Sequence, residues 1–112
     1  MRTDPRRDLM DRREKAQQLL AALARDFDEI VDAAQSVSTD DEHDPEGTTI
    51  AFERAQVDVM LTRTRRQIDE LDQAIARFDD GTYGVCQRCG MTIPADRLHA
   101  RPAASTCVGC AG

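Results

Sequence analysis

The chain has 112 residues, of which 32% are charged and 4% are aromatic, and its formal net charge at pH 7 is −6. This length excludes a large globular core, and the sequence lacks the run of about eighteen apolar residues that a membrane-spanning helix needs. The negative charge argues against nucleic acid as the main partner, because phosphate binding depends on lysine and arginine. Few aromatic residues among many charged ones favour long helices.

The first predicted helix begins at Pro5 and ends near Val37 or Ser38. Asp4 can cap its first turn, and a proline is well tolerated at the first helical position. The Ser-Thr-Asp-Asp sequence that follows Val37 offers the backbone competing side-chain partners and so favours termination. Apolar residues recur along this helix at the spacing of a coiled-coil stripe, which we call the first seam: Leu9, Ala16, Leu20, Leu23, Phe27, Ile30, Ala34 and Val37.

An acidic turn is predicted between residues 39 and 47. From Asp26 to Glu46 the sequence has nine acidic residues and neither lysine nor arginine. A run of like charges is most often a solvated surface. It is also a candidate tip that could enter a positively lined cavity or approach bound magnesium, which prefers oxygen ligands.

The second predicted helix begins at Pro45, after a capping Asp44, and ends near Gly81. A short connection favours antiparallel neighbours, so we expect a long hairpin within one chain, with Phe27 near Val57. A homodimeric coiled coil is the alternative. The second helix repeats the spacing of the first in a second seam: Ile50, Val57, Leu61, Thr64, Ile68, Leu71, Ile75 and Phe78.

All four cysteines of the chain stand as two C-x-x-C pairs, which is the spacing of a structural zinc site. Four thiolates leave no open position for a catalytic water. Two disulfides are the alternative, but the first twenty residues contain no apolar segment typical of a secretion signal, so we expect a cytoplasmic protein. His99 could replace one cysteine, although an ordinary loop histidine is the simpler interpretation. The predicted ligands of one zinc ion are Cys86, Cys89, Cys107 and Cys110.

These elements predict a mainly α fold, with a long antiparallel coiled-coil hairpin over residues 1–80 and a small four-cysteine zinc finger over residues 81–112 at its base. A finger of this size has too little apolar surface to fold without its metal. Its few apolar residues are therefore expected to pack around the ion and against Phe78 and Leu9: Tyr83, Val85, Ile93, Leu98 and Val108.

The finger sequence resembles the zinc finger of the DksA/TraR family. The resemblance rests on the stretch DGTYGVCQRCG at residues 80–90, on Ile93-Pro94 and Arg97-Leu98, on Ala100-Arg101-Pro102, and on the second cysteine pair. Proteins of this family carry a coiled-coil hairpin before the finger. The resemblance thus covers the finger by motif and the hairpin by layout.

The resemblance implies a transcription regulator that binds bacterial RNA polymerase, inserts the hairpin tip into the secondary channel and modulates initiation. The family's tip motif, D-x-x-D-x-A, maps onto Asp41 and Asp44, and Glu46 stands in place of the alanine as a further tip carboxylate. By the same resemblance, Arg97 and Arg101 are candidate contacts to polymerase or to an alarmone. We expect a monomer that neither recognises a DNA sequence nor binds a membrane.

The sequence also allows two other functions. One is a zinc-ribbon module that binds nucleic acid through Arg88, Arg97 and Arg101. The other is a stress-related zinc adaptor that never enters the polymerase channel. The sequence contains no credible catalytic set and no glycine-rich phosphate loop, so we expect no enzymatic activity.

Overall fold

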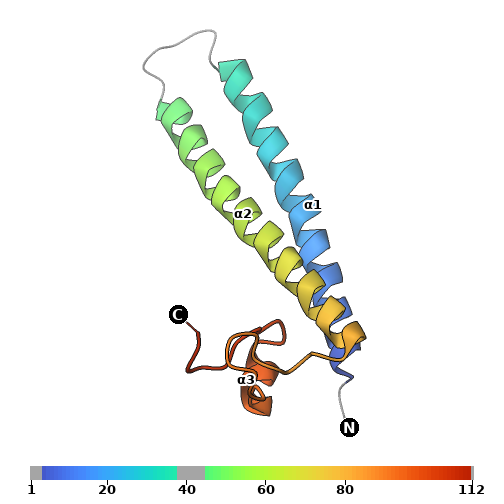
Figure 1. The fold of residues 1–112 in the computed structure, drawn as a ribbon. Helices are drawn as coiled ribbons and strands as arrows, with labels where there is room; N and C mark the ends of the chain where they lie inside the picture. The colour runs from blue at the N-terminus through green and yellow to red at the C-terminus, as the bar shows by residue number, and fades with distance from the viewer. Residues whose placement is uncertain (1–3, 38–44, 112) are drawn as a thin grey trace. The chain divides into compact units, whose positions relative to one another are not determined.

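The computed structural model describes residues 4–37 and 45–111, which contain three helices: α1 (Pro5–Val37), α2 (Pro45–Asp80) and α3 (Ala95–Ala100) (Figure 1). The predicted helix bounds are confirmed. The Asp4 side chain accepts a hydrogen bond from the Arg6 amide at 3.1 Å, which caps α1 as expected. The predicted cap of α2, Asp44, lies outside the described residues.

Helix α2 ends because Gly81 adopts a φ of +85°, a left-handed conformation that glycine enters without a steric penalty. The amides of Thr82 and Tyr83 both donate to the Arg77 carbonyl, at 2.8 and 3.1 Å. These bonds satisfy a carbonyl at the helix end and turn the chain toward the cysteines.

The chain forms two compact units, Ala16–Arg66 and Met1–Lys15 with Gln67–Gly112. We call them the helix-pair unit and the finger unit. The predicted division at residue 80 follows the motifs and stays a prediction, because compactness divides the chain at other positions. Within the described helices, no segment has the length and apolar character needed to span a membrane.

The helix-pair unit is built on the two seams. Ala16 and Leu23 of α1 and Leu61 and Thr64 of α2 each have at most 5% of their surface exposed. The buried Thr64 hydroxyl donates to the Met60 carbonyl at 2.8 Å, so this buried polar group has a hydrogen-bond partner. The other described seam residues of the unit are half-buried: Leu20, Phe27, Ile30, Ile50 and Val57.

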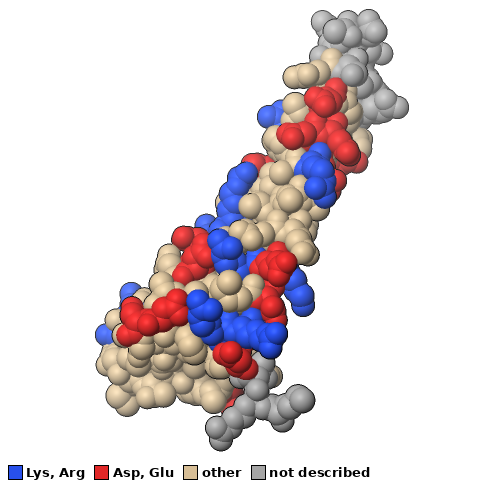
Figure 2. All heavy atoms as spheres, turned by 90° about the vertical axis from the view of Figure 1, so that its right-hand side faces the viewer, with Lys and Arg blue, Asp and Glu red and all other residues tan. Residues whose placement is uncertain are grey.

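The polar surface of this unit carries charges of both signs. On the face that Figure 2 shows, acidic side chains gather on the helices close to the grey residues and are interleaved with basic ones. Arg54, which replaces an apolar seam residue, places its guanidinium 5.5 Å from the centre of the Phe27 ring. This cation–π contact joins α1 to α2 at a position where the second seam has no apolar side chain.

In the finger unit, the first turns of α1 pack against the last turns of α2 in antiparallel register. Arg6 pairs with Asp79 at 2.8 Å. Arg13, seven residues further along α1, pairs with Asp72, seven residues earlier in α2. Leu9, Leu71 and Ala74 are buried in the same part of the finger unit. The fold-class prediction of a mainly α chain, with an antiparallel helical hairpin and a four-cysteine finger, is confirmed.

The finger core differs from the prediction at two positions. Ile93 is 2% exposed, and Tyr83 and Leu98 are half-buried, as expected. Val85 and Val108, however, are 41% and 68% exposed. Val108 stands between two cysteines of one turn, whose sulfurs face inward, so the intervening side chain faces solvent.

Candidate metal centre

Two short turns present the four cysteines. In the first turn, the Cys86 amide donates to the Met91 carbonyl at 2.8 Å, and the Gly90 amide donates to the Cys86 carbonyl at 2.9 Å. Gly90 has a φ of +74°, which explains the glycine after the second cysteine. In the second turn, the amides of Cys110 and Ala111 donate to the Cys107 carbonyl.

Hydrogen bonds from main chain and side chains hold the two turns together. The Gln87 amide donates to the Ser105 carbonyl at 2.9 Å, and the Arg88 guanidinium donates to the Cys110 carbonyl at 3.0 Å. The first bond joins the first turn to the segment just before the second turn, and the second bond joins the two turns directly, so the cysteine pairs are held close together. Sequence reasoning assigned Arg88 to a possible nucleic-acid surface and missed this structural role.

The four sulfur atoms converge on one point. Their Sγ atoms all lie within 4.8 Å of one another, and those of Cys89 and Cys107 are 3.8 Å apart. Zn–S bonds of about 2.3 Å in a tetrahedron place sulfurs about 3.8 Å apart, whereas a disulfide requires about 2.05 Å. The arrangement therefore fits one structural zinc ion and does not fit the disulfide alternative.

The environment of the sulfurs also favours a cation. Amide N–H groups of Cys89 and Cys107 lower the pKa of Cys86 to about 6, so this thiol ionises readily. Hydrogen bonding with the neighbouring Cys107 and Cys89 side chains raises the pKa of Cys110 to about 12. Four thiolates at this spacing repel one another, and a divalent cation removes that repulsion.

His99 does not belong to this cluster. Within the described part of the chain, the only group of potential metal ligands consists of the four cysteines. His99 lies on α3 and lines a separate groove with Tyr83, Asp8 and Pro102. His99 was thus correctly expected not to be a ligand, but the expected loop position is wrong because residues 95–100 are helical.

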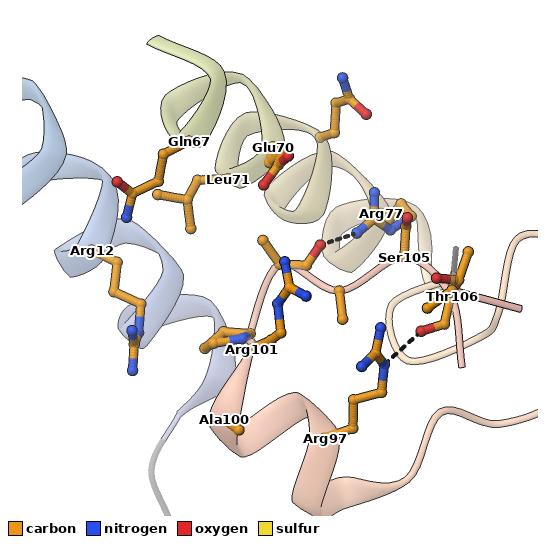
Figure 3. A pocket seen from close by; sticks show the side chains of 15 residues that line it. Arg12, Gln67, Glu70, Leu71, Arg77, Arg97, Ala100, Arg101, Ser105 and Thr106 are labelled. Carbon is orange, nitrogen blue, oxygen red and sulfur yellow. Dashed lines mark hydrogen bonds between the residues drawn. The ribbon is translucent and has the colours of Figure 1, made fainter. Parts of the chain in front are cut away.

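The candidate contacts Arg97 and Arg101 line a second feature of the finger unit, a cavity of about 440 Å³ (Figure 3). Arg97 donates from Nε to the Thr106 carbonyl at 2.8 Å, while Arg101 is exposed. The cavity wall contains two further arginines, Arg12 and Arg77, and one carboxylate, Glu70. Four guanidinium groups around one carboxylate give the cavity a positive character.

Sequence reasoning missed Arg12 and Arg77 because both were counted as ordinary residues of the hairpin helices. Arg77 is 7% exposed and donates to the Ala103 carbonyl at 3.4 Å. Arg77 comes two residues after the seam residue Ile75 and so points away from the seam, where α2 is otherwise exposed. The sequence therefore offered no local signal that the finger covers Arg77.

The predicted tip residues Asp41 and Asp44 lie outside the described residues. Glu46 belongs to the first turn of α2, but its side chain is likewise not described. The tip assignment thus stays a prediction.

Comparison with known proteins decides the family of the finger. Residues 81–112 match the model of the prokaryotic dksA/traR C4-type zinc finger. The chain carries a DksA/TraR-type zinc finger. The predicted family of the finger and the predicted cofactor, one structural zinc ion, are both confirmed.

Curated relatives match over part of their length. The RNA polymerase-binding transcription factor DksA of Caulobacter vibrioides is 46% identical over 46 residues, which cover 41% of this chain and 32% of the relative. General stress protein 16O of Bacillus subtilis is 34% identical over 62 residues, which cover 55% of this chain and 38% of the relative. The chain thus spans roughly a third of the length of the curated relatives it matches.

A solved structure extends the likeness beyond the finger. The transcription factor DksA2 from Pseudomonas aeruginosa superposes with a TM-score of 0.78 at 23% sequence identity. The match covers 94% of this chain and 75% of DksA2. At this level of identity the match establishes a shared fold.

Proposed function

We propose that this chain is a transcription regulator that binds bacterial RNA polymerase in the cytoplasm and has no catalytic role of its own. The observation that carries the proposal is the DksA/TraR-type finger at residues 81–112, directly preceded by two long helices. A relative with this finger is named as an RNA polymerase-binding transcription factor, and the DksA2 fold matches along most of the chain.

We further propose that the connection between α1 and α2 enters the secondary channel of the polymerase and modulates initiation there. Asp41 and Asp44 would approach the catalytic region, with Glu46 adding a third carboxylate. Carboxylate oxygens are ligands that magnesium prefers, so these side chains could act on the metal or on the residues that hold it.

The finger has a supporting role in this proposal. Cys86, Cys89, Cys107 and Cys110 ligate one zinc ion, which fixes the finger unit and leaves no coordination position for chemistry. The positive cavity beside them, with Arg101 exposed at its wall, supplies a contact to polymerase or to an anionic alarmone, and Arg97 supports that wall through Thr106.

The test separates binding from activity. Asp41→Asn and Asp44→Asn variants should still be captured by purified RNA polymerase but lose their effect on transcription from a promoter with a short-lived open complex. Asp58→Asn removes a carboxylate from an exposed position on α2 and serves as the matched control. Full activity of both tip variants would remove the tip from the mechanism.

A photo-crosslinker at residue 42 tests the location independently. We expect crosslinks to residues that line the secondary channel. Crosslinks confined to the outer surface of the polymerase would contradict insertion, and capture of other proteins in place of polymerase would favour the adaptor function.

Direct binding to nucleic acid is the weaker candidate. Of the three arginines that it requires, Arg88 and Arg97 donate to carbonyl groups within the finger. A mobility-shift assay at two salt concentrations tests it, because phosphate-driven binding weakens steeply as salt rises. Polymerase binding without a shift of free DNA or RNA would exclude this candidate.

A further inference from the structure

The segment between α3 and the second cysteine pair, residues 101–106, contains neither helix nor strand. It forms one wall of the arginine-lined cavity, and Arg101 at its start is exposed. An irregular segment usually moves more than a helix or a strand, because no regular ladder of main-chain hydrogen bonds holds it. In this segment, however, the carbonyl groups accept hydrogen bonds from several other parts of the finger unit.

Two side chains hold the carbonyl groups that directly follow Arg101. The Tyr83 hydroxyl donates to the Pro102 carbonyl at 2.9 Å, and the Arg77 guanidinium donates to the Ala103 carbonyl at 3.4 Å. The two donors are also joined to each other, because the Tyr83 amide donates to the Arg77 carbonyl at 3.1 Å. The end of α2 and the start of the finger thus fix the backbone beside Arg101.

The other end of the segment is fixed next to the metal centre. The Gln87 amide donates to the Ser105 carbonyl at 2.9 Å, and Arg97 donates from Nε to the Thr106 carbonyl at 2.8 Å. Thr106 directly precedes Cys107, a member of the sulfur cluster. The segment is therefore held at both ends by the same unit that holds the cysteines.

The backbone of Arg101 is bonded on both sides, whereas its side chain is exposed at the cavity wall (Figure 3). Its amide donates to the Arg97 carbonyl at 2.7 Å, and its carbonyl accepts a hydrogen bond from the Ala104 amide at 2.9 Å. Arg77, by contrast, is 7% exposed and offers a partner little surface. A side chain presented from a fixed backbone loses less conformational freedom when it binds.

We propose that Tyr83 and Arg77 are positioning residues for Arg101. They fix the two carbonyl groups after Arg101, and they thereby present its guanidinium to RNA polymerase without contacting polymerase themselves. This inference rests on the proposed function, in which Arg101 is a polymerase contact. It extends that contact to two residues that only the folded finger unit brings close to Arg101.

Binding of the zinc-loaded full chain to purified RNA polymerase tests the proposal. Tyr83→Phe removes only the hydroxyl that holds the Pro102 carbonyl, and it should weaken binding about two- to tenfold, the range that one hydrogen bond can supply. Arg77→Met keeps a long unbranched side chain and should weaken binding to a similar extent. Arg77→Lys keeps a cationic donor and should recover part of that loss.

Combination with Arg101→Ala separates positioning from direct contact. If Tyr83 and Arg77 act through Arg101, neither Tyr83→Phe nor Arg77→Met should weaken binding further once residue 101 is alanine. Residues that contact polymerase themselves, or that only stabilise the finger, would weaken binding equally in both backgrounds. An equal effect in both backgrounds would overturn the proposal.

Thr64→Val is the matched control. Like Tyr83→Phe, it removes a hydroxyl that donates to a main-chain carbonyl, but Thr64 is buried in the helix-pair unit and lies outside the cavity wall. Polymerase binding should therefore be unchanged in Thr64→Val. A loss equal to that of Tyr83→Phe would show a general loosening of the chain and would overturn the proposal.

Hydrogen exchange in the free protein distinguishes failure of this inference from failure of the proposed function. The Ala104 amide, which bonds to the Arg101 carbonyl, should exchange at least about threefold faster in Tyr83→Phe and Arg77→Met, while the Cys86 amide in the first cysteine turn should keep its rate. Faster exchange in the variants of a chain that does not bind polymerase would refute the function and support the positioning of Arg101. An unchanged Ala104 rate would overturn the positioning whether or not polymerase binds.

Discussion

The helix-pair unit and the finger unit are stabilised in different ways. In the finger unit, the ion pairs Arg6–Asp79 and Arg13–Asp72 cross between helices, main-chain bonds join the cysteine turns, and four sulfurs surround one point. The described residues of the helix-pair unit contain no cluster of metal ligands, and the unit depends on the buried side chains of its seam. The two units should therefore unfold in response to different perturbations.

Zinc removal gives the largest expected effect and acts on the finger unit. Structural zinc contributes on the order of 10 kcal/mol to the folding of small finger domains, so apo protein should lose the fold of residues 81–112. Most of the helical circular dichroism signal should survive, because the seam residues of the helix-pair unit are not metal ligands. Chelator titration with bound zinc measured in parallel checks this expectation.

The single tyrosine of the chain separates the two units in this experiment. Tyr83 packs its ring 5.6 Å from the Phe78 ring, and the chain contains no tryptophan. Tyrosine fluorescence therefore reports on the finger unit, while the helical signal comes mostly from the long helices. Parallel loss of both signals at the same chelator concentration would show that the units do not separate.

A seam substitution acts on the helix-pair unit. Leu23→Ala removes a side chain that is 5% exposed and should lower the free energy of unfolding by about 2–4 kcal/mol, because a buried cavity remains. Leu19→Ala is the matched control, since Leu19 is on the same helix and 45% exposed. Its cost should stay below about 1 kcal/mol.

Thermal unfolding followed by circular dichroism measures both variants. Zinc content should stay at one ion per chain in each, because neither leucine belongs to the finger unit. Equal destabilisation by Leu23→Ala and Leu19→Ala would contradict the claim that the buried seam stabilises the helix-pair unit. Loss of zinc from Leu23→Ala would contradict the independent stability of the two units.

The helices were predictable from the sequence because their determinants are local. Asp4-Pro5 and Gly81 act within one turn of the chain, and a seam repeats often enough that one departure, such as Arg54, does not obscure it. The cysteine spacing predicted the metal cluster for the same reason. Each of these features depends on residue types at short, fixed separations.

The finger surface was less predictable because long-range packing determines it. Arg12, Arg77 and Arg101 are far apart in sequence, and only the folded finger unit brings them around one cavity. Val85 and Val108 are apolar, yet they are exposed because the turns direct the sulfurs inward. Hydrophobicity alone does not reveal which side of such a turn faces solvent.

The substitution Tyr83→Phe has the smallest expected effect on stability and tests a contact within the finger unit. Its hydroxyl donates to the Pro102 carbonyl at 2.9 Å, which ties the start of the finger to the segment after α3. Tyr83→Phe keeps the ring and removes this bond, so the free energy of unfolding should fall by about 1 kcal/mol. Zinc content and helical signal should not change.

The stability that Tyr83 contributes should depend on pH, and the direction follows from the shift of its pKa. Burial, with a further contribution from Asp8, raises the pKa of Tyr83 above its ordinary value of 10.0. Folding thus favours the protonated phenol, and its contribution to stability is present below the unfolded pKa and lost as pH rises through the folded pKa. Phenolate absorbance should show the raised value in the zinc-loaded protein and the ordinary value after zinc removal. An ordinary value in both forms would mean that the finger does not bury this ring.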